Sequence, residues 1–128
     1  MADNTHPTLG SGKICYLEIP ATDIAVSAAF YQTVFGWRIR TRSDGSVSFD
    51  DGVGEVSGSW LLDREPAEQM GTLIHIMVDD GAATVEAIKA NGGTIVQNID
   101  PHAREVVARF RDPAGNMFGV YQHRSSGG

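Results

Sequence analysis

An internal repeat constrains the fold of this chain more than any other feature of its sequence. The segment from Asp23 to Gly36 has the same length as the segment from Asp80 to Gly93. In both copies an apolar, strand-like segment comes before the aspartate, and apolar residues at helical spacing follow it. Such a repeat is typical of a supersecondary unit that cannot close a core alone and pairs with its copy. The sequence therefore predicts two similar half-modules.

Each half-module is predicted to run strand, helix, strand, strand, strand. The first helix carries Val26, Phe30 and Val34 at every fourth position, which predicts one buried face, and the second carries Val85 and Ile88. The predicted strands are 13–19, 37–42, 47–50 and 55–62 in the first half and 72–78, 94–98, 105–111 and 116–122 in the second, and the predicted helices are 24–35 and 80–90. This pattern indicates an α+β fold of two paired βαβββ modules.

The length and composition fit one globular domain. The 128 residues are 41% hydrophobic and 20% charged, close to globular averages. We expect a single domain over residues 13–122, with half-modules 13–62 and 71–122 joined by a short polar loop. Residues 1–12 and 123–128 are polar and without periodicity, which predicts flexible tails.

Charge and hydropathy exclude two classes of partner. The formal net charge is -6, and beyond the alternating Arg38, Arg40 and Arg42 no basic cluster exists, so nucleic acid is not an expected partner. No apolar run approaches the roughly 18 residues of a membrane span, and the N-terminus does not resemble a signal peptide. The sequence thus predicts a cytoplasmic protein with no membrane partner. The single cysteine, Cys15, lies in an apolar segment and is predicted to be a buried, inert thiol.

Three segments carry a resemblance to a known family. They are LEIPATDIAVSAAFYQTVFGW (17–37), VDDGAATVEAIKANGG (78–93) and RDPAGNMFGVYQ (111–122). Together they resemble the vicinal oxygen chelate superfamily of glyoxalases, bleomycin resistance proteins and extradiol dioxygenases. The resemblance covers about residues 13–122. It implies a U-shaped, eight-stranded sheet around a cavity, and a homodimer as the usual assembly.

The metal site of that superfamily is not expected here. The resemblance implies that metal-dependent members hold a divalent ion by His or Glu side chains, and it places Tyr16, about Gly58, Leu73 and Gly119 at these positions. None of these replaces an imidazole or carboxylate well. We therefore expect no metal and no other cofactor, and a small-molecule ligand held by side chains alone, as in bleomycin resistance proteins. An enzyme of lyase or isomerase type, or a glyoxalase-like enzyme with a relocated metal site, remains an alternative.

Glu18 and His75 are the candidate catalytic pair. The repeat that matches Asp23 with Asp80 also matches Glu18 with His75, so they are counterparts on the first strands of the two halves. Strand parity places Glu18 with Tyr16 on one face, and His75 with Leu73 and Met77. A carboxylate within reach of an imidazole would orient it as a general base. The alternatives are a histidine packed in the core and a relocated metal site that uses both residues. Whether the protein is an enzyme stays open.

Several apolar and aromatic residues are candidates for lining a ligand cavity. They offer stacking surfaces and two phenolic hydroxyls for orienting a flat ligand, and plain core packing is the alternative for each. The candidates are Tyr16, Trp60, Leu73, Met77, Met117 and Tyr121.

The last two strands contain a basic pair and a turn motif. Arg109 and Arg111 alternate beside Asp112, which favours a surface ion pair over a clamp for a substrate carboxylate. The segment from Asp112 to Asn116, Asp-Pro-Ala-Gly-Asn, is predicted to be a tight structural turn and not a catalytic motif.

Overall fold

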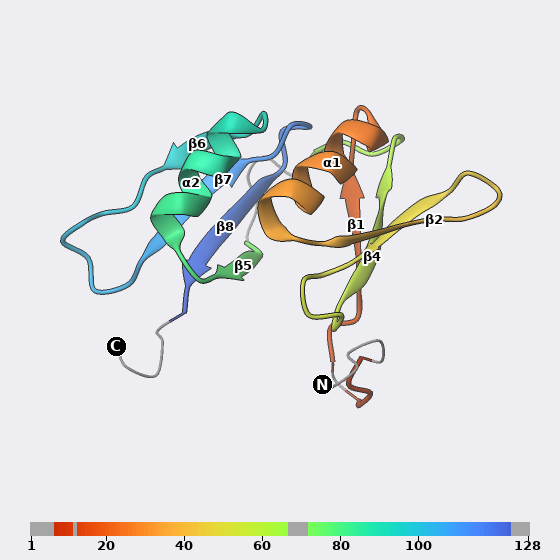
Figure 1. Ribbon diagram of the computed structural model, residues 1–128, viewed down its shortest axis with the longest axis horizontal. Helices are drawn as coiled ribbons and strands as arrows, with labels where there is room; N and C mark the ends of the chain where they lie inside the picture. Colours follow the sequence, from red (N-terminus) through yellow and green to blue (C-terminus); the bar gives the residue numbers. More distant parts are fainter. Residues whose placement is uncertain (1–6, 12, 67–71, 124–128) are drawn as a thin grey trace. The chain divides into compact units, whose positions relative to one another are not determined.

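The computed structural model describes residues 7–11, 13–66 and 72–123 and divides the chain into two compact units, Met1–Glu65 (unit 1) and Pro66–Gly128 (unit 2). Figure 1 shows that each unit consists of one helix and one sheet. The flexibility predicted for residues 1–12 and 123–128 falls largely outside the described residues. No helix in the described ranges is long and apolar enough to cross a membrane.

The two units have the same order of elements. Unit 1 contains β1 (Tyr16–Pro20), α1 (Ile24–Phe35), β2 (Arg38–Thr41), β3 (Val47–Asp50) and β4 (Ser57–Leu61), and unit 2 contains β5 (His75–Val78), α2 (Gly81–Ala90), β6 (Thr94–Gln97), β7 (Val107–Arg111) and β8 (Met117–Gln122). The sheet orders are β1-β4-β3-β2 and β5-β8-β7-β6. In each sheet the first and last strands pair in parallel and the other pairs are antiparallel. The predicted α+β fold of two βαβββ modules is confirmed.

Both helices begin at an aspartate cap. The carboxylate of Asp23 accepts hydrogen bonds from the amides of Ala25 and Val26, and that of Asp80 accepts one from the amide of Ala83. These bonds satisfy amides that have no partner inside the helix. The two helix starts that the repeat predicted therefore have a common physical cause.

The repeat shifts by one position where the helices end. Gly36 follows α1 with φ of 72°, and the glycine with the matching left-handed backbone after α2 is Gly92, with φ of 97°. The spacing of the repeat predicted Gly93 in that role. Gly93 instead permits a close approach, because a Cβ atom there would lie 2.5 Å from Cγ2 of Ile88.

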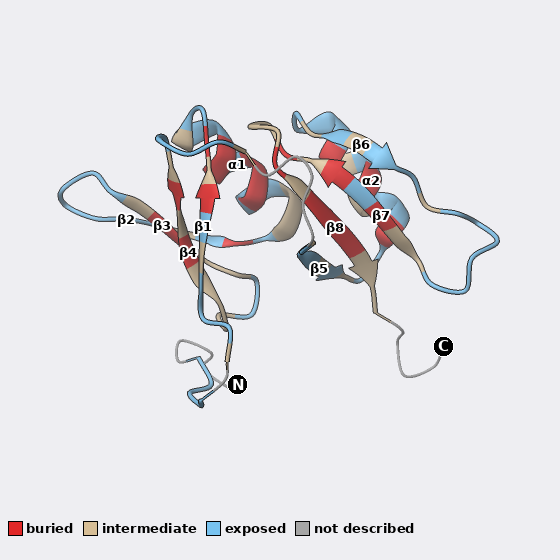
Figure 2. Ribbon diagram, turned by 180° about the vertical axis from the view of Figure 1, so that it is seen from behind, coloured by how far each residue is buried: buried red, intermediate tan, exposed pale blue. Residues whose placement is uncertain are grey.

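Unit 1 has an aromatic core on the helix side of its sheet, and Figure 2 marks buried residues on α1 and on the strands of this sheet. Ring centroids are 4.5 Å apart for Tyr31 and Trp37, 4.5 Å for Trp37 and Phe49, and 4.8 Å for Phe49 and Trp60. The buried face of α1 carries Ser27, Ala28, Phe30 and Tyr31. Of the predicted face of Val26, Phe30 and Val34, Phe30 is buried and Val34 is half-buried, whereas Val26 is 48% exposed. An almost uniformly apolar helix allows several such stripes, and spacing alone did not select the buried one.

Unit 2 has a smaller and mainly aliphatic core. Its buried apolar residues are Val85, Ile88, Ala108, Phe110, Phe118 and Val120. The prediction that Val85 and Ile88 mark the inner face of the helix is confirmed. The rings of Phe110 and Phe118 are 6.1 Å apart. The equal architecture of the two units thus rests on different packing.

Candidate functional site

Each sheet has one face covered by the helix of its own unit and an opposite face, which we call the open face. In unit 1, Ile19, Phe49 and Trp60 are buried on the helix side. The residues between them along the strands point the other way. On β1, β3 and β4 the open face of unit 1 carries Tyr16, Glu18, Ser48, Asp50, Ser57 and Ser59.

The polar groups on the open face of unit 1 bind one another. The carboxylate of Glu18 lies 2.8 Å from the guanidinium of Arg64. The hydroxyl of Tyr16 donates to Oγ of Ser59 at 3.2 Å. Partners within unit 1 thus already occupy the two residues of β1 that the sequence marked as candidates.

Asp50 is the second centre of this network. Its Oδ1 accepts from Nη2 of Arg40 at 2.9 Å and from Oγ of Ser57 at 2.7 Å. The alternating arginines of β2 therefore include one that is paired across the sheet. The open face of unit 1 is polar but largely satisfied by its own side chains.

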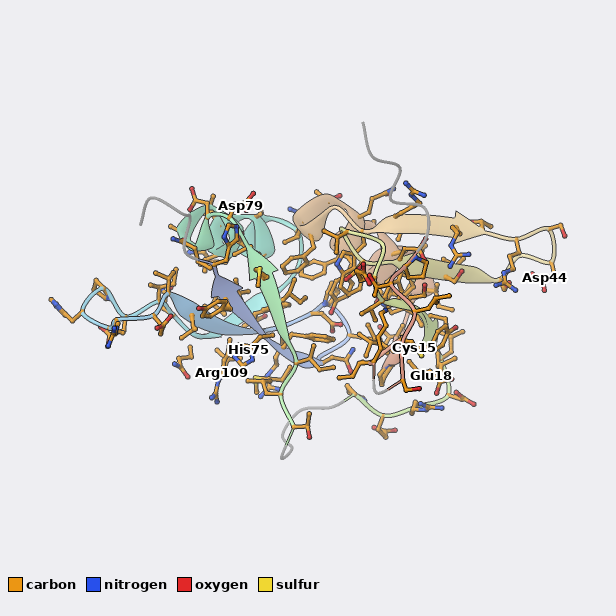
Figure 3. All side chains as sticks on the ribbon, turned by 90° about the horizontal axis from the view of Figure 1, so that it is seen from below. Cys15, Glu18, Asp44, His75, Asp79 and Arg109 are labelled. Carbon is orange, nitrogen blue, oxygen red and sulfur yellow. The ribbon has the colours of Figure 1, made fainter. Side chains whose placement is uncertain are left out.

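The open face of unit 2 is built around Gly119. On β5 and β7, His75 and Arg109 are both register partners of Gly119, and Met77 and Val107 are both partners of Tyr121. Register partners on neighbouring strands point to the same side of a sheet. Figure 3 shows the side chains of His75 and Arg109 on the side of the sheet away from α2. This face combines a basic residue, an imidazole and apolar surface.

The imidazole of His75 lies on the backbone of Gly119. A Cβ atom added to Gly119 would be 2.4 Å from Cδ2 and 2.6 Å from Nε2 of the ring. The ring therefore fills the space that any larger residue would take. His75 is exposed, so the alternative of a histidine packed in the core is not what the structure shows. Within the described part of unit 2, its ring nitrogens have no hydrogen-bond partner.

Arg109 is exposed and, among residues 72–123, forms no ion pair. A surface ion pair was predicted for Arg109 and Arg111 beside Asp112. It does not form at Arg109 within the described ranges, and Asp112 is buried in the turn. Its Oδ1 accepts from the amides of Ala114 and Asn116, each at 2.9 Å. The turn is structural, as predicted. Strand parity counted back from this turn would have placed Arg109 beside Gly119, a signal that the sequence reasoning did not use.

The remaining candidates of unit 2 lie on or beside its open face. Met77 is 65% exposed, and Met117 and Tyr121 are half-buried on β8. The hydroxyl of Tyr121 donates to the carboxylate of Glu105 at 3.2 Å. Leu73 precedes β5 and is half-buried. Their role in binding a ligand stays a prediction.

Two residues lie where the sequence did not predict them. Trp60 is 2% exposed and packs in the core of unit 1, on the helix side of β4, so its predicted place in a ligand cavity is wrong. Cys15, predicted to be buried, is exposed. Cys15 directly precedes Tyr16, the first residue of β1, and its side chain is not covered by other described residues.

The described side chains do not fit a divalent metal ion. No group of three His, Cys, Asp or Glu residues in the described ranges could hold one. At the second position implied by the resemblance, Gly58 faces the core, since a Cβ there would lie 2.4 Å from Cζ of the buried Phe49. Its neighbours on the open face are Ser57 and Ser59, which are weak ligands for such an ion.

The comparisons with known proteins agree with this architecture. Residues 13–120 match the model of the family described as the Glyoxalase/Bleomycin resistance protein/Dioxygenase superfamily. A glyoxylase-like domain-containing protein of Didymella fabae is 30% identical over 126 residues, which cover 85% of this chain and 92% of that protein. The lactoylglutathione lyase of Haemophilus influenzae is 27% identical over 128 residues, which cover 89% of this chain and 95% of the enzyme.

Solved structures show the same fold at lower identity. A fosfomycin resistance protein from Listeria monocytogenes superposes with a TM-score of 0.71 and 16% identity, over 88% of this chain and 92% of that one. At this identity the likeness shows the fold alone.

Proposed function

This chain belongs to the Glyoxalase/Bleomycin resistance protein/Dioxygenase superfamily, and we propose that it binds a small organic molecule on the open face of unit 2 without a metal ion. The observation that carries the proposal is the exposed imidazole of His75 on the bare backbone of Gly119. Around it, Met77 and Tyr121 supply apolar and aromatic surface for the body of a ligand. A few polar groups within an apolar surface are what small-molecule sites commonly offer.

The proposal of metal independence rests on the donor set. Glycine at positions 58 and 119, and leucine at 73, offer no side-chain ligand. Glu18 supplies a carboxylate, but that carboxylate is paired with Arg64. A relocated metal site would have to recruit Glu18 away from this partner.

A ligand screen with and without chelation tests the proposal. Saturation-transfer NMR with a panel of small aromatic and carbonyl compounds should find binders whose affinity is the same before and after EDTA treatment. The purified protein should carry well under one equivalent of zinc, nickel, manganese or iron. Binding that disappears on chelation and returns with added metal would contradict the proposal.

An enzyme of lyase or isomerase type is the second candidate, because relatives at 27% and 25% identity are named lactoylglutathione lyase. In that case His75 would move a proton and Glu18 would orient its ring. The two residues lie in different units, and the pair stays a proposal. Turnover of lactoylglutathione by the wild type, lost in His75→Ala, would support it. Turnover that depends on added zinc or nickel would instead favour a relocated metal site.

The homodimer also stays a proposal, as does the cytoplasmic location. Each four-stranded sheet has two edge strands, and the unpaired backbone groups of an edge strand can pair with a second chain. Sedimentation equilibrium at two protein concentrations should give the mass of a dimer, and a monomer at both concentrations would contradict this.

A further inference from the structure

We propose that the open face of unit 2 recognises a carboxylate on its ligand, held between the guanidinium of Arg109 and the imidazole of His75 above Gly119. This inference rests on the proposed function and names the chemical class of the ligand: an organic acid with a flat apolar body.

The sheet register sets the spacing of the two groups. His75 and Arg109 lie on the strands either side of β8, and both are register partners of Gly119. Neighbouring strands are about 4.8 Å apart, so the two Cα atoms are separated by roughly 10 Å. Gly119 puts no side chain between them. The ring of His75 covers the backbone of Gly119, so a ligand carboxylate would lie beside the ring, on its side toward β7.

The position of the imidazole supports this arrangement. The ring of His75 extends over β8, because it occupies the space above Gly119, and its Nε2 is 2.6 Å from the place of a Cβ atom there. Since the strand order is β5-β8-β7, the ring extends from β5 toward the strand that carries Arg109. The ring nitrogen Nε2 is thus a possible donor on β8, the strand next to the one that carries Arg109.

The charges of the described residues leave Arg109 available. In unit 2 the carboxylate of Asp112 is taken up by its turn, and that of Glu105 accepts from Tyr121. An arginine on an exposed face, with no ion pair among the described residues of unit 2, is a strong donor for an external anion. A guanidinium binds a carboxylate in a two-pronged, charge-assisted geometry.

The apolar residues along the strands give the ligand its body. Met77 follows His75 on the same face of β5, and its register partner Tyr121 follows Gly119 on the same face of β8. A flat group attached to the carboxylate would rest against the thioether and the phenol ring. An aromatic carboxylic acid therefore fits both halves of the surface.

Titration calorimetry with benzoate and its neutral analogue benzamide tests the inference on the full chain. Arg109→Gln should weaken benzoate binding by about tenfold or more, since hydrogen bonds to charged groups are among the stronger ones. The matched control Arg42→Gln removes the same charge from exposed unit 1 surface and should change it less than about twofold. Benzamide should bind with equal, weaker affinity to all three proteins.

A second variant and defined outcomes keep the test decisive. Arg109→Lys keeps the charge without the two-pronged donor and should bind benzoate with intermediate affinity. The inference is overturned if benzoate binds no tighter than benzamide, or if Arg42→Gln weakens it as much as Arg109→Gln. If other compounds bind and benzoate does not, this inference fails while the proposed function stands. If no compound of the panel binds, both fail.

Discussion

The open faces of the two units differ in how far their polar groups are satisfied. In unit 1, Glu18 on the first strand is paired with Arg64, and its register partner Ser59 accepts from Tyr16. In unit 2 the corresponding strand positions are His75 and its register partner Gly119. A glycine in place of a serine removes a side chain from the floor of the face and lets an imidazole lie there. The same module thus carries a face closed by its own hydrogen bonds in unit 1 and an exposed imidazole over a glycine in unit 2.

The helix sides of the sheets differ as well. Unit 1 stacks aromatic rings around Phe49, whereas unit 2 packs Phe110 mainly among aliphatic residues. Aromatic pairs add about 0.5–1.5 kcal/mol beyond the burial of their area. We therefore expect the first core to be more sensitive to truncation.

The largest effect is expected for Phe49→Ala. It removes a fully buried ring that contacts two tryptophans, and it should lower the free energy of unfolding by about 4 kcal/mol. Phe110→Ala removes an equally buried ring that packs against Phe118 within a mainly aliphatic core, and should cost about 3 kcal/mol. Urea unfolding of both variants checks the order. An equal or reversed loss would break the comparison of the two cores.

The next effect separates two glycines on opposite faces. In Gly58→Ala the new methyl group would meet the carbonyl oxygen of Leu17 and the ring of Phe49, neither of which can move easily. Overpacking of this kind should cost about 3 kcal/mol. In Gly119→Ala the three nearest atoms to the new methyl group all belong to the ring of His75, which can rotate away, so the cost should be below about 1 kcal/mol. Thermal unfolding in which Gly119→Ala is the less stable variant would contradict this assignment of faces.

A smaller difference is expected between the helix caps. Asp23→Ala removes two hydrogen bonds to helix amides and Asp80→Ala removes one to a helix amide. Losses of about 1.5 and 1 kcal/mol are expected, within the usual range for caps. The matching variants Asp23→Asn and Asp80→Asn should lose less, because an amide oxygen also caps. If Asp80→Ala costs more than Asp23→Ala in urea, the hydrogen bonds do not set the order.

The smallest effect concerns acid. Hydrogen bonds from the amide and hydroxyl of Thr8, followed by the charge of Lys13, hold the pKa of Glu55 below its ordinary value. A carboxyl whose pKa is lower in the folded state than in the unfolded chain stabilises the fold at pH values above its ordinary pKa. This stabilisation is lost as the pH falls through the lowered pKa. An NMR titration should therefore show the Thr8 amide losing its hydrogen bond only at acidic pH. A Glu55 carboxyl that titrates at its ordinary value would exclude the effect, and Glu55→Gln serves as the control.

Local signals predicted the elements better than they predicted the environment of single side chains. The bounds of α1 followed from an aspartate cap and a glycine stop, both of which act over a short stretch of chain. Trp60 was misplaced because its side of the sheet depends on the register of β4 with β3, in which Phe49 pairs with Gly58. Cys15 was wrongly predicted to be buried because an apolar stretch of sequence does not show at which residue the strand leaves the packed part of the sheet. The role of Arg109 depends on Gly119 in the next strand, and only the turn at Asp112 relates the two.

Chemical-shift mapping of bound benzoate on the isotope-labelled chain tests the central claim most directly. We expect the largest amide shifts at Gly119, Met77 and Arg109, on β8, β5 and β7, with little change at Tyr16 and Ser59 of unit 1. Shifts of equal or larger size at Tyr16 and Ser59 would contradict the claim that unit 2 carries the available face.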